Sequence, residues 1–161
     1  MRIFAYNLIF LILLPFTVAR IIIKSFLDKG YLTNFHHRFG IYKKISSQKH
    51  IWFHAVSLGE VISSETIIRR LLNDTNLVLT TSTPTGYREA KKIYGNDVKI
   101  VYAPWDFILF VKGFIKIFNP IALILFETEV WPSMIYLSEK RKIPVILSNA
   151  RLSESSYKRY L

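Results

Sequence analysis

The 161-residue sequence contains no cysteine, so disulfide bonds and thiolate metal ligands are both excluded. Only four histidines are present, and their spacing is not the His-x-x-x-His pattern of a helical metal site. Acidic residues are also scarce, with 11 Asp and Glu against 22 Lys and Arg. We therefore expect no metal ion and no other cofactor.

The shortage of acidic residues leaves a formal net charge of +11, which favours polyanionic partners. Nucleic acid, an anionic membrane surface and a phosphorylated substrate all fit, and charge alone does not choose among them. Hydrophobic residues make up 51% of the chain and aromatic residues 15%. This composition excludes disorder and requires a packed core or a membrane segment.

The N-terminal region contains a long apolar run. No charged residue occurs from Ile3 to Ala19, and three isoleucines after Arg20 extend the run to Ile23. This length matches a helix that crosses about 30 Å of hydrocarbon. Basic residues gather after the run, so the positive-inside rule predicts a single-pass anchor at 1–23 with the domain on the cytoplasmic side. A cleaved signal peptide and a buried amphipathic helix remain open alternatives.

Residues 24–49 mix aromatic and basic side chains. This mixture is typical of segments in the headgroup region of a membrane, where amphipathic rings and lysines are well accommodated. An ordinary surface linker has a similar composition. We expect an interfacial segment here and leave the linker interpretation open.

Five short apolar runs alternate with helix-like stretches in residues 50–161. Such alternation predicts an α/β fold in which helices flank a parallel, Rossmann-like sheet. Thr83-Pro84 offers an N-cap followed by proline at the first helical position, and Gly95 stands where that helix would end. The expected strands are His50–Val56, Asn76–Thr81, Val98–Ala103, Ile121–Phe126 and Pro144–Leu147.

Polar residues follow the first two runs, at the sheet edge where open α/β folds bind their ligands. The sequence "SLGE" places Ser57, Gly59 and Glu60 where a strand turns into a helix. Glu60 is either a catalytic base or a first-turn carboxylate, which the helix dipole favours by about 0.3–1 kcal/mol. In "TSTPTG", Thr83 and Gly86 either cap a helix or bind an anion through backbone N–H groups.

A pair of carboxylates follows the fourth run. Glu127 and Glu129 come directly after "IALILF", and carboxylates at the end of a buried strand are costly unless paired or used. Arg151 in "NAR" is a natural partner for either of them. A structural ion pair and a functional pair both remain open.

Five motifs in this order, "WFHAVSLGEV", "TTSTPTG", "YAPWD", "ETEVWP" and "NARLSESS", resemble the N-terminal half of the bacterial 3-deoxy-D-manno-octulosonic acid (Kdo) transferases. The resemblance covers the whole chain, including the anchor and "RFG" at 38–40. It implies a two-domain GT-B glycosyltransferase that is inverting and metal-independent. Such an enzyme transfers Kdo from CMP-Kdo to the lipid A precursor lipid IVA at the bacterial inner membrane.

The resemblance also implies roles for single residues. In the family, the glutamate of the Ser-x-Gly-Glu motif is the proposed base that deprotonates the glucosamine 6-hydroxyl, and Glu60 matches it. Glu127 matches the first glutamate of Glu-Thr-Glu and would be the second catalytic carboxylate. The matched motifs supply the implied substrate-binding residues, which are Ser57, Gly59, Thr83, Gly86, Glu129 and Arg151.

Family members carry a second Rossmann-like domain that supplies most of the CMP-Kdo site, and this chain ends at Leu161 before it. We therefore expect the chain to bind the acceptor and to be inactive in transfer by itself, as a truncated or split N-terminal half. One alternative is a noncatalytic, membrane-anchored remnant that binds the lipid A precursor. A membrane-tethered binder of nucleic acid rests on charge alone, and the resemblance implies no nucleic-acid partner.

Overall fold

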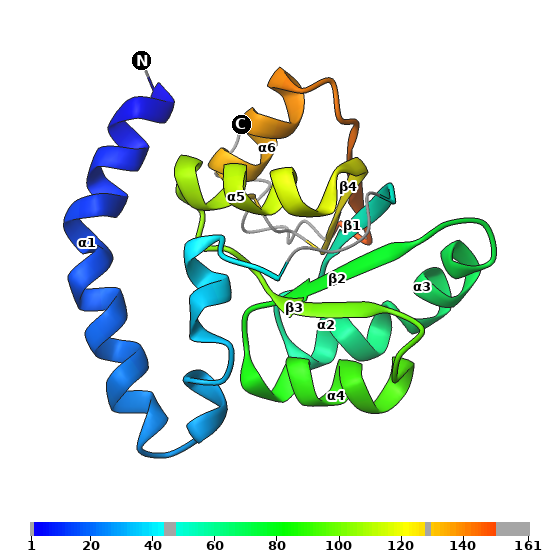
Figure 1. The fold of residues 1–161 in the computed structure, drawn as a ribbon, viewed down its shortest axis with the longest axis horizontal. Helices are drawn as coiled ribbons and strands as arrows, with labels where there is room; N and C mark the ends of the chain where they lie inside the picture. The colour runs from blue at the N-terminus through cyan, green and yellow to red at the C-terminus, as the bar shows by residue number, and fades with distance from the viewer. Residues whose placement is uncertain (1, 44–47, 128–129, 151–161) are drawn as a thin grey trace, which may run out of the picture.

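A computed structural model describes residues 2–43, 48–127 and 130–150 (Figure 1). Its centre is a sheet of five parallel strands in the order β3-β2-β1-β4-β5. This is the order of a Rossmann-type sheet, and it confirms the α/β prediction. The strands are β1 (His50–His54), β2 (Leu77–Thr81), β3 (Lys99–Tyr102), β4 (Pro120–Phe126) and β5 (Val145–Ser148).

Helices cover both faces of the sheet, with α5 and α6 on one face and α2, α3 and α4 on the other (Figure 1). The chain begins with a long helix that runs beside the domain, and two short 3-10 turns connect it to β1. The helical elements are α1 (Arg2–Ser25), η1 (Lys29–Tyr31), η2 (Phe35–Phe39), α2 (Leu58–Ser63), α3 (Glu65–Leu72), α4 (Pro84–Tyr94), α5 (Ile108–Phe118) and α6 (Pro132–Lys140).

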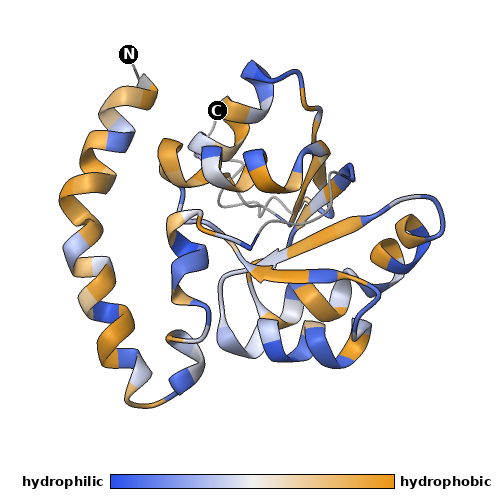
Figure 2. Cartoon of the chain, viewed as in Figure 1, coloured by the Kyte–Doolittle hydropathy of each residue, from blue (hydrophilic) through white to orange (hydrophobic). Residues whose placement is uncertain are grey.

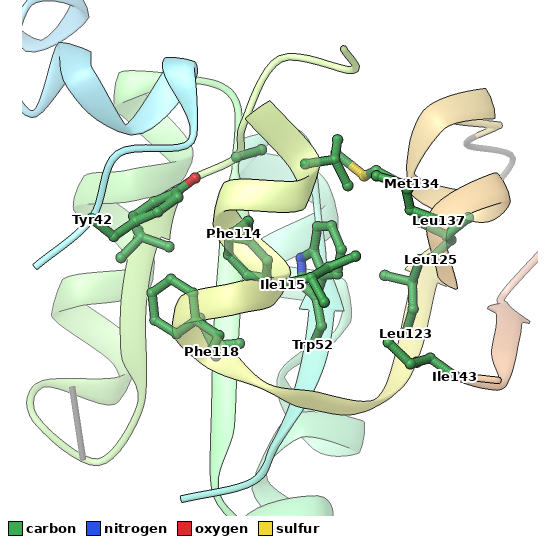
Figure 3. Close-up of a cluster of buried hydrophobic side chains, with 14 residues drawn as sticks. Tyr42, Trp52, Phe114, Ile115, Phe118, Leu123, Leu125, Met134, Leu137 and Ile143 are labelled. Atoms are coloured by element: carbon green, nitrogen blue, oxygen red, sulfur yellow. The ribbon is translucent and has the colours of Figure 1, made fainter. Parts of the chain in front are cut away.

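The two faces of β1 bury different clusters because successive side chains of a strand point to opposite sides. Trp52 packs with the α5 and α6 residues, including Phe114 at a ring-centroid distance of 4.1 Å (Figure 3). Phe53 packs with the cluster under α2 to α4. Both side chains are fully buried, which explains why the strand is a continuous apolar run.

The predicted helix signals are confirmed in α4. Thr83 is the N-cap of α4, where its Oγ1 accepts a hydrogen bond from the Gly86 N–H at 3.1 Å. Gly95 ends that helix with a φ of 54°, a conformation that favours glycine. In α5, the buried residues Val111, Phe114, Ile115 and Phe118 recur at intervals of three and four, which is the spacing of one helix face.

Helix α1 is long and apolar enough to cross a membrane, and most of it has the colour of hydrophobic residues in Figure 2. Large side chains such as Phe4 and Phe16 are exposed on it. It also contacts the domain through a polar residue. Asn7 accepts a hydrogen bond from the Ile108 N–H at 2.8 Å and donates one to Ser133 Oγ at 3.3 Å. The first contact satisfies a free N–H at the start of α5 and links α1 to the domain.

Part of the segment 24–49 is integrated into the domain. His37 and Arg38 in η2 are buried, and Tyr42 belongs to the core cluster beneath α5. The contact is close because Gly40 faces Gly113 of α5, and a Cβ on Gly40 would overlap the Phe110 carbonyl. The position of this segment at a membrane surface stays a prediction.

Candidate active site

Glu60 lies in the first turn of α2 and is only 6% exposed. Its carboxylate accepts hydrogen bonds from the Val56 N–H at 2.8 Å and the Ser57 N–H at 3.2 Å. In return, Ser57 Oγ accepts a hydrogen bond from the Glu60 N–H at 3.4 Å, which completes a capping box. A carboxylate has about four lone-pair positions, so two remain for a substrate. Capping and base chemistry are therefore compatible in one side chain.

The turn at Ser57, which leads into the first turn of α2 and Glu60, lies against the start of α4. A Cβ on Gly86 would lie 2.6 Å from Thr81 Oγ1 and 3.2 Å from the Ser57 carbonyl carbon. Glycine at position 86 therefore lets the two loops approach. The structure brings together Ser57, Glu60, Thr83 and Gly86, which the sequence places in separate motifs.

Gly59 differs from Gly86 because no packing contact requires it. It is exposed, and the nearest atom to an added Cβ is Ser57 Oγ at 4.0 Å. A small residue at an exposed helix start permits close approach of a ligand to the backbone. This geometry agrees with the substrate-binding role implied for Gly59 and leaves that role as a prediction.

Glu127 directly follows β4, the strand next to β1. His54 pairs with Leu125, so Glu127 lies two residues beyond this pair, at the level of the loop that holds Glu60. Its φ is 62°, a left-handed conformation that costs a residue with a side chain about 1–2 kcal/mol. The Glu127 N–H donates to the Ser148 carbonyl at 2.8 Å and holds this turn. The two predicted catalytic carboxylates thus come from neighbouring strand ends.

Two predicted site residues, Glu129 and Arg151, lie outside the described residues. Their substrate-binding roles, and the pairing of Arg151 with a glutamate, stay predictions. Among the residues that the structure describes, there is no group of three or more His, Asp or Glu side chains arranged to hold a metal ion.

A cavity of about 240 Å³ lies at the carboxyl edge of the sheet, beside the second half of α1. We refer to it as the α1 cavity. Among the described residues of the predicted site, only Thr83 lies in its wall, and the other wall residues that matter here were not predicted from the sequence. These are Arg20, Lys24, Arg38, His54 and Trp131.

His54 is the most buried of these cavity residues, with no exposed surface. Its Nδ1 is 2.9 Å from Thr80 Oγ1, and its Nε2 has no hydrogen-bond partner among the described residues. Burial lowers the pKa of His54 to about 4. The sequence signal that could have identified His54 as a site residue is its position as a polar residue inside the apolar run "IWFHAV".

We expect the burial of His54 to make the chain less stable in acid. An unfolded histidine binds a proton near its ordinary pKa of 6.5, whereas folded His54 binds one only near pH 4. Between these values the unfolded state holds more protons, so the free energy of unfolding falls as the pH falls. The loss due to His54 is about 3 kcal/mol at pH 4.

Urea unfolding from about pH 7.5 down to about pH 4 measures this effect, with the His54→Gln variant as the comparison. Glutamine cannot gain a proton, so the variant should lose markedly less stability over this range. Equal pH slopes for the two proteins would show that His54 does not cause the acid sensitivity.

Known proteins that are similar to this chain identify its family. Residues 33–161 match the family model described as 3-deoxy-D-manno-octulosonic-acid transferase (kdotransferase). The 3-deoxy-D-manno-octulosonic acid transferase of Haemophilus influenzae is 35% identical over 162 residues, which cover 98% of this chain and 38% of the relative. The bifunctional glycosyltransferase/methyltransferase of Fusobacterium nucleatum is 31% identical over 85% of this chain and 21% of its own length.

A third relative, the 3-deoxy-D-manno-octulosonic acid transferase of Bordetella pertussis, is 31% identical over 66% of this chain and 26% of the relative. The chain therefore spans well under half the length of these relatives. The family match nevertheless includes the strand ends that carry Glu60 and Glu127. The chain belongs to the 3-deoxy-D-manno-octulosonic acid transferase family.

Proposed function

We propose that this chain is the acceptor-binding half of a GT-B glycosyltransferase that transfers Kdo from CMP-Kdo to lipid IVA in lipopolysaccharide biosynthesis. One observation carries the proposal. Glu60 and Glu127 stand at the carboxyl ends of the neighbouring strands β1 and β4, the edge where open α/β sheets bind their ligands. Membership of the family supports Kdo as the transferred sugar.

In the proposed reaction, Glu60 accepts the proton of an acceptor hydroxyl while the hydroxyl oxygen bonds to the anomeric carbon of Kdo. The bond between that carbon and the CMP phosphate breaks, and CMP leaves with the electron pair. Attack from the opposite side inverts the anomeric centre. The base must come within about 2.6–3.2 Å of the hydroxyl oxygen, directly or through one water.

The two N–H groups that bind the Glu60 carboxylate would fix its orientation. Positioning of this kind lowers the entropic cost of reaching the transition state. Glu127 would help to place the acceptor from the neighbouring strand. The donor nucleotide would bind mainly to a C-terminal domain, supplied by a separate chain or by the rest of a longer one.

Helix α1 would hold the domain at the cytoplasmic face of the bacterial inner membrane. Its exposed apolar surface and the basic residues that follow it support this placement (Figure 2). An anchor confines the search for a lipid acceptor to two dimensions. The net charge of +11 favours approach to an anionic leaflet and to the phosphates of lipid IVA.

A second candidate function is noncatalytic binding of the lipid A precursor. The observation that favours it is the capping box, because both Glu60 carboxylate oxygens already accept backbone N–H bonds. In this case Glu60 only stabilises the start of α2. The two candidates predict the same acceptor binding and differ in transfer.

Binding and transfer should be measured separately. The 161-residue chain in phosphatidylcholine nanodiscs should bind lipid IVA, and the same discs without lipid IVA are the control. Transfer should be measured in a chimera in which this chain replaces the matching N-terminal part of the Haemophilus influenzae relative. We expect Kdo transfer from CMP-Kdo that depends on Glu60.

The outcomes separate the candidates. Lipid IVA binding together with transfer by the chimera supports the transferase. Binding without transfer, in a chimera that is folded and binds CMP-Kdo, supports the noncatalytic candidate. Failure to bind lipid IVA would contradict both.

A further inference from the structure

Three buried nitrogen atoms in the wall of the α1 cavity have no hydrogen-bond partner among the described residues. They are Arg38 Nε, His54 Nε2 and Trp131 Nε1, and they belong to η2, β1 and the loop before α6. A buried polar group without a partner costs about 1–3 kcal/mol. Three such atoms around one cavity indicate that a polar ligand completes it.

We propose that the α1 cavity binds a phosphate group carried by a sugar or a lipid headgroup. The arginine Nε–H and the tryptophan Nε1–H can only donate hydrogen bonds, so the ligand must supply acceptors. The described cavity wall contains three cationic side chains, those of Arg20, Lys24 and Arg38, and no carboxylate. The negatively charged oxygens of a phosphate accept hydrogen bonds from these N–H groups and also balance the cationic side chains.

Arg38 is the strongest argument for an anion. It is 2% exposed, and none of the described carboxylates lies within ion-pair distance of it. Its Nη2 donates to the Ser82 carbonyl at 3.2 Å, and its guanidinium lies over the Tyr102 ring at 4.7 Å from the centroid. These contacts orient the group without neutralising it. A buried charge is tolerated when it has an opposite charge beside it, and a phosphate would provide one.

His54 can join this site in its neutral form. The Thr80 hydroxyl accepts a hydrogen bond from Trp52 Nε1 at 2.8 Å, and its single proton has two possible acceptors. These are the Phe53 carbonyl at 3.3 Å and His54 Nδ1 at 2.9 Å. When the proton is directed to Nδ1, the histidine carries its own proton on Nε2 and donates into the cavity.

Helix α1 forms one wall of the cavity. Arg20 and Lys24 lie one turn apart near the end of this helix, and Lys24 Nζ is 5.5 Å from the centroid of the Tyr31 ring. Arg20 is exposed, so its charge faces water and can meet an entering ligand. The predicted membrane anchor would therefore also be one wall of a binding site.

The cavity suits a headgroup rather than a whole lipid. Its volume of about 240 Å³ lies below the roughly 300–1,000 Å³ of pockets that enclose drug-sized ligands. The inference rests on the proposed function only for the identity of the natural ligand, which would be a phosphorylated acceptor. Binding without donor or transfer therefore tests it independently.

Side-chain indole N–H signals of the ¹⁵N-labelled chain in dodecyl maltoside micelles, whose headgroups carry no phosphate, provide the measurement. Glucose 1-phosphate and inorganic phosphate are the probes, and glucose is the uncharged control. We expect the Trp131 signal, assigned with Trp131→Phe, to shift with both phosphates and not with glucose. Arg38→Gln should weaken binding at least about tenfold, because a charge-assisted hydrogen bond is lost.

Arg20→Gln provides a second variant, since Arg20 is exposed and its replacement should not disturb folding. We expect about fivefold weaker binding. Arg70→Gln is the matched control, because Arg70 is exposed, carries the same charge and lies on α3 away from the cavity. This control should bind as the unmodified chain does.

Micelles of the same detergent with added phosphatidylglycerol distinguish two sources of phosphate. A Trp131 shift with phosphatidylglycerol alone supports the site and assigns it to bulk phospholipid. A Trp131 shift with glucose 1-phosphate and none with phosphatidylglycerol also supports the site and assigns it to a phosphorylated sugar. Absence of any shift, an equal shift with glucose, or equal weakening by Arg20→Gln and Arg70→Gln would overturn the inference.

Discussion

Replacing Glu60 by glutamine is expected to lower Kdo transfer by the chimeric enzyme at least about 100-fold, because general base catalysis contributes about 10²–10⁴ to the rate. Glutamine keeps one oxygen that can accept a backbone N–H bond and loses the second acceptor of the pair. The backbone N–H that loses its acceptor is partly buried, so we expect the free energy of unfolding to fall by about 1–3 kcal/mol. Steady-state transfer assays and urea unfolding of the same variant measure the two effects.

Ser64→Ala is the matched control for this experiment. Ser64 is buried at the junction of α2 and α3, and its Oγ donates to the Val61 carbonyl at 3.1 Å. Its loss should cost about 1 kcal/mol and leave transfer by the folded enzyme unchanged. Similar losses of transfer in Glu60→Gln and Ser64→Ala would mean that Glu60 acts through stability alone.

Replacing Gly40 by alanine is expected to lower the free energy of unfolding by about 3–5 kcal/mol, which is a large part of the stability of a domain this size. Two effects add here. Gly40 has a φ of 72°, and an added Cβ would overlap the backbone of Phe110 in α5. Backbone atoms cannot rotate away as a flexible side chain can, so the η2 segment must separate from α5.

Gly95→Ala separates these two effects. Gly95 also has a positive φ, of 54°, but an added Cβ would meet no atom within 4 Å. This variant should lose only the conformational part of the stability, so it should be clearly more stable than Gly40→Ala in urea unfolding. Equal losses would contradict the close approach of η2 to α5.

A displaced η2 segment would also affect the α1 cavity, since Arg38 lies two residues before Gly40. Gly40→Ala should therefore weaken phosphate binding even where the protein remains folded. The Trp131 indole signal described above reports this effect.

The strand pattern was readable from the sequence because the strands of a parallel sheet are buried on both faces. Continuous apolar runs result, and the five predicted strands agree with the observed ones to within about two residues at each end. The cap of α4 and its final glycine were readable for a similar reason, since both depend on local backbone geometry. The carboxylates at the strand ends followed from the same pattern.

The sequence did not predict which strands lie beside β1, although this strand order determines which residues come together in the candidate site. Strand order brings β4 beside β1, and so places Glu127 near the loop of Glu60 across more than sixty residues of sequence. The capping box of Glu60 was one of two open interpretations, and only the orientation of its carboxylate shows that it forms. Local patterns predict elements, and the pairing of elements depends on long-range packing.

The sequence by itself determined the apolar N-terminal helix, the parallel α/β domain and the family, because all three are encoded in local periodicity and short motifs. Only the tertiary structure decided that Arg38, His54 and Trp131 surround one cavity beside α1. Arg38 appears in the sequence as an ordinary surface cation. Its burial without a carboxylate is visible only after folding, because it results from the packing of η2 against the edge of a sheet formed by distant residues.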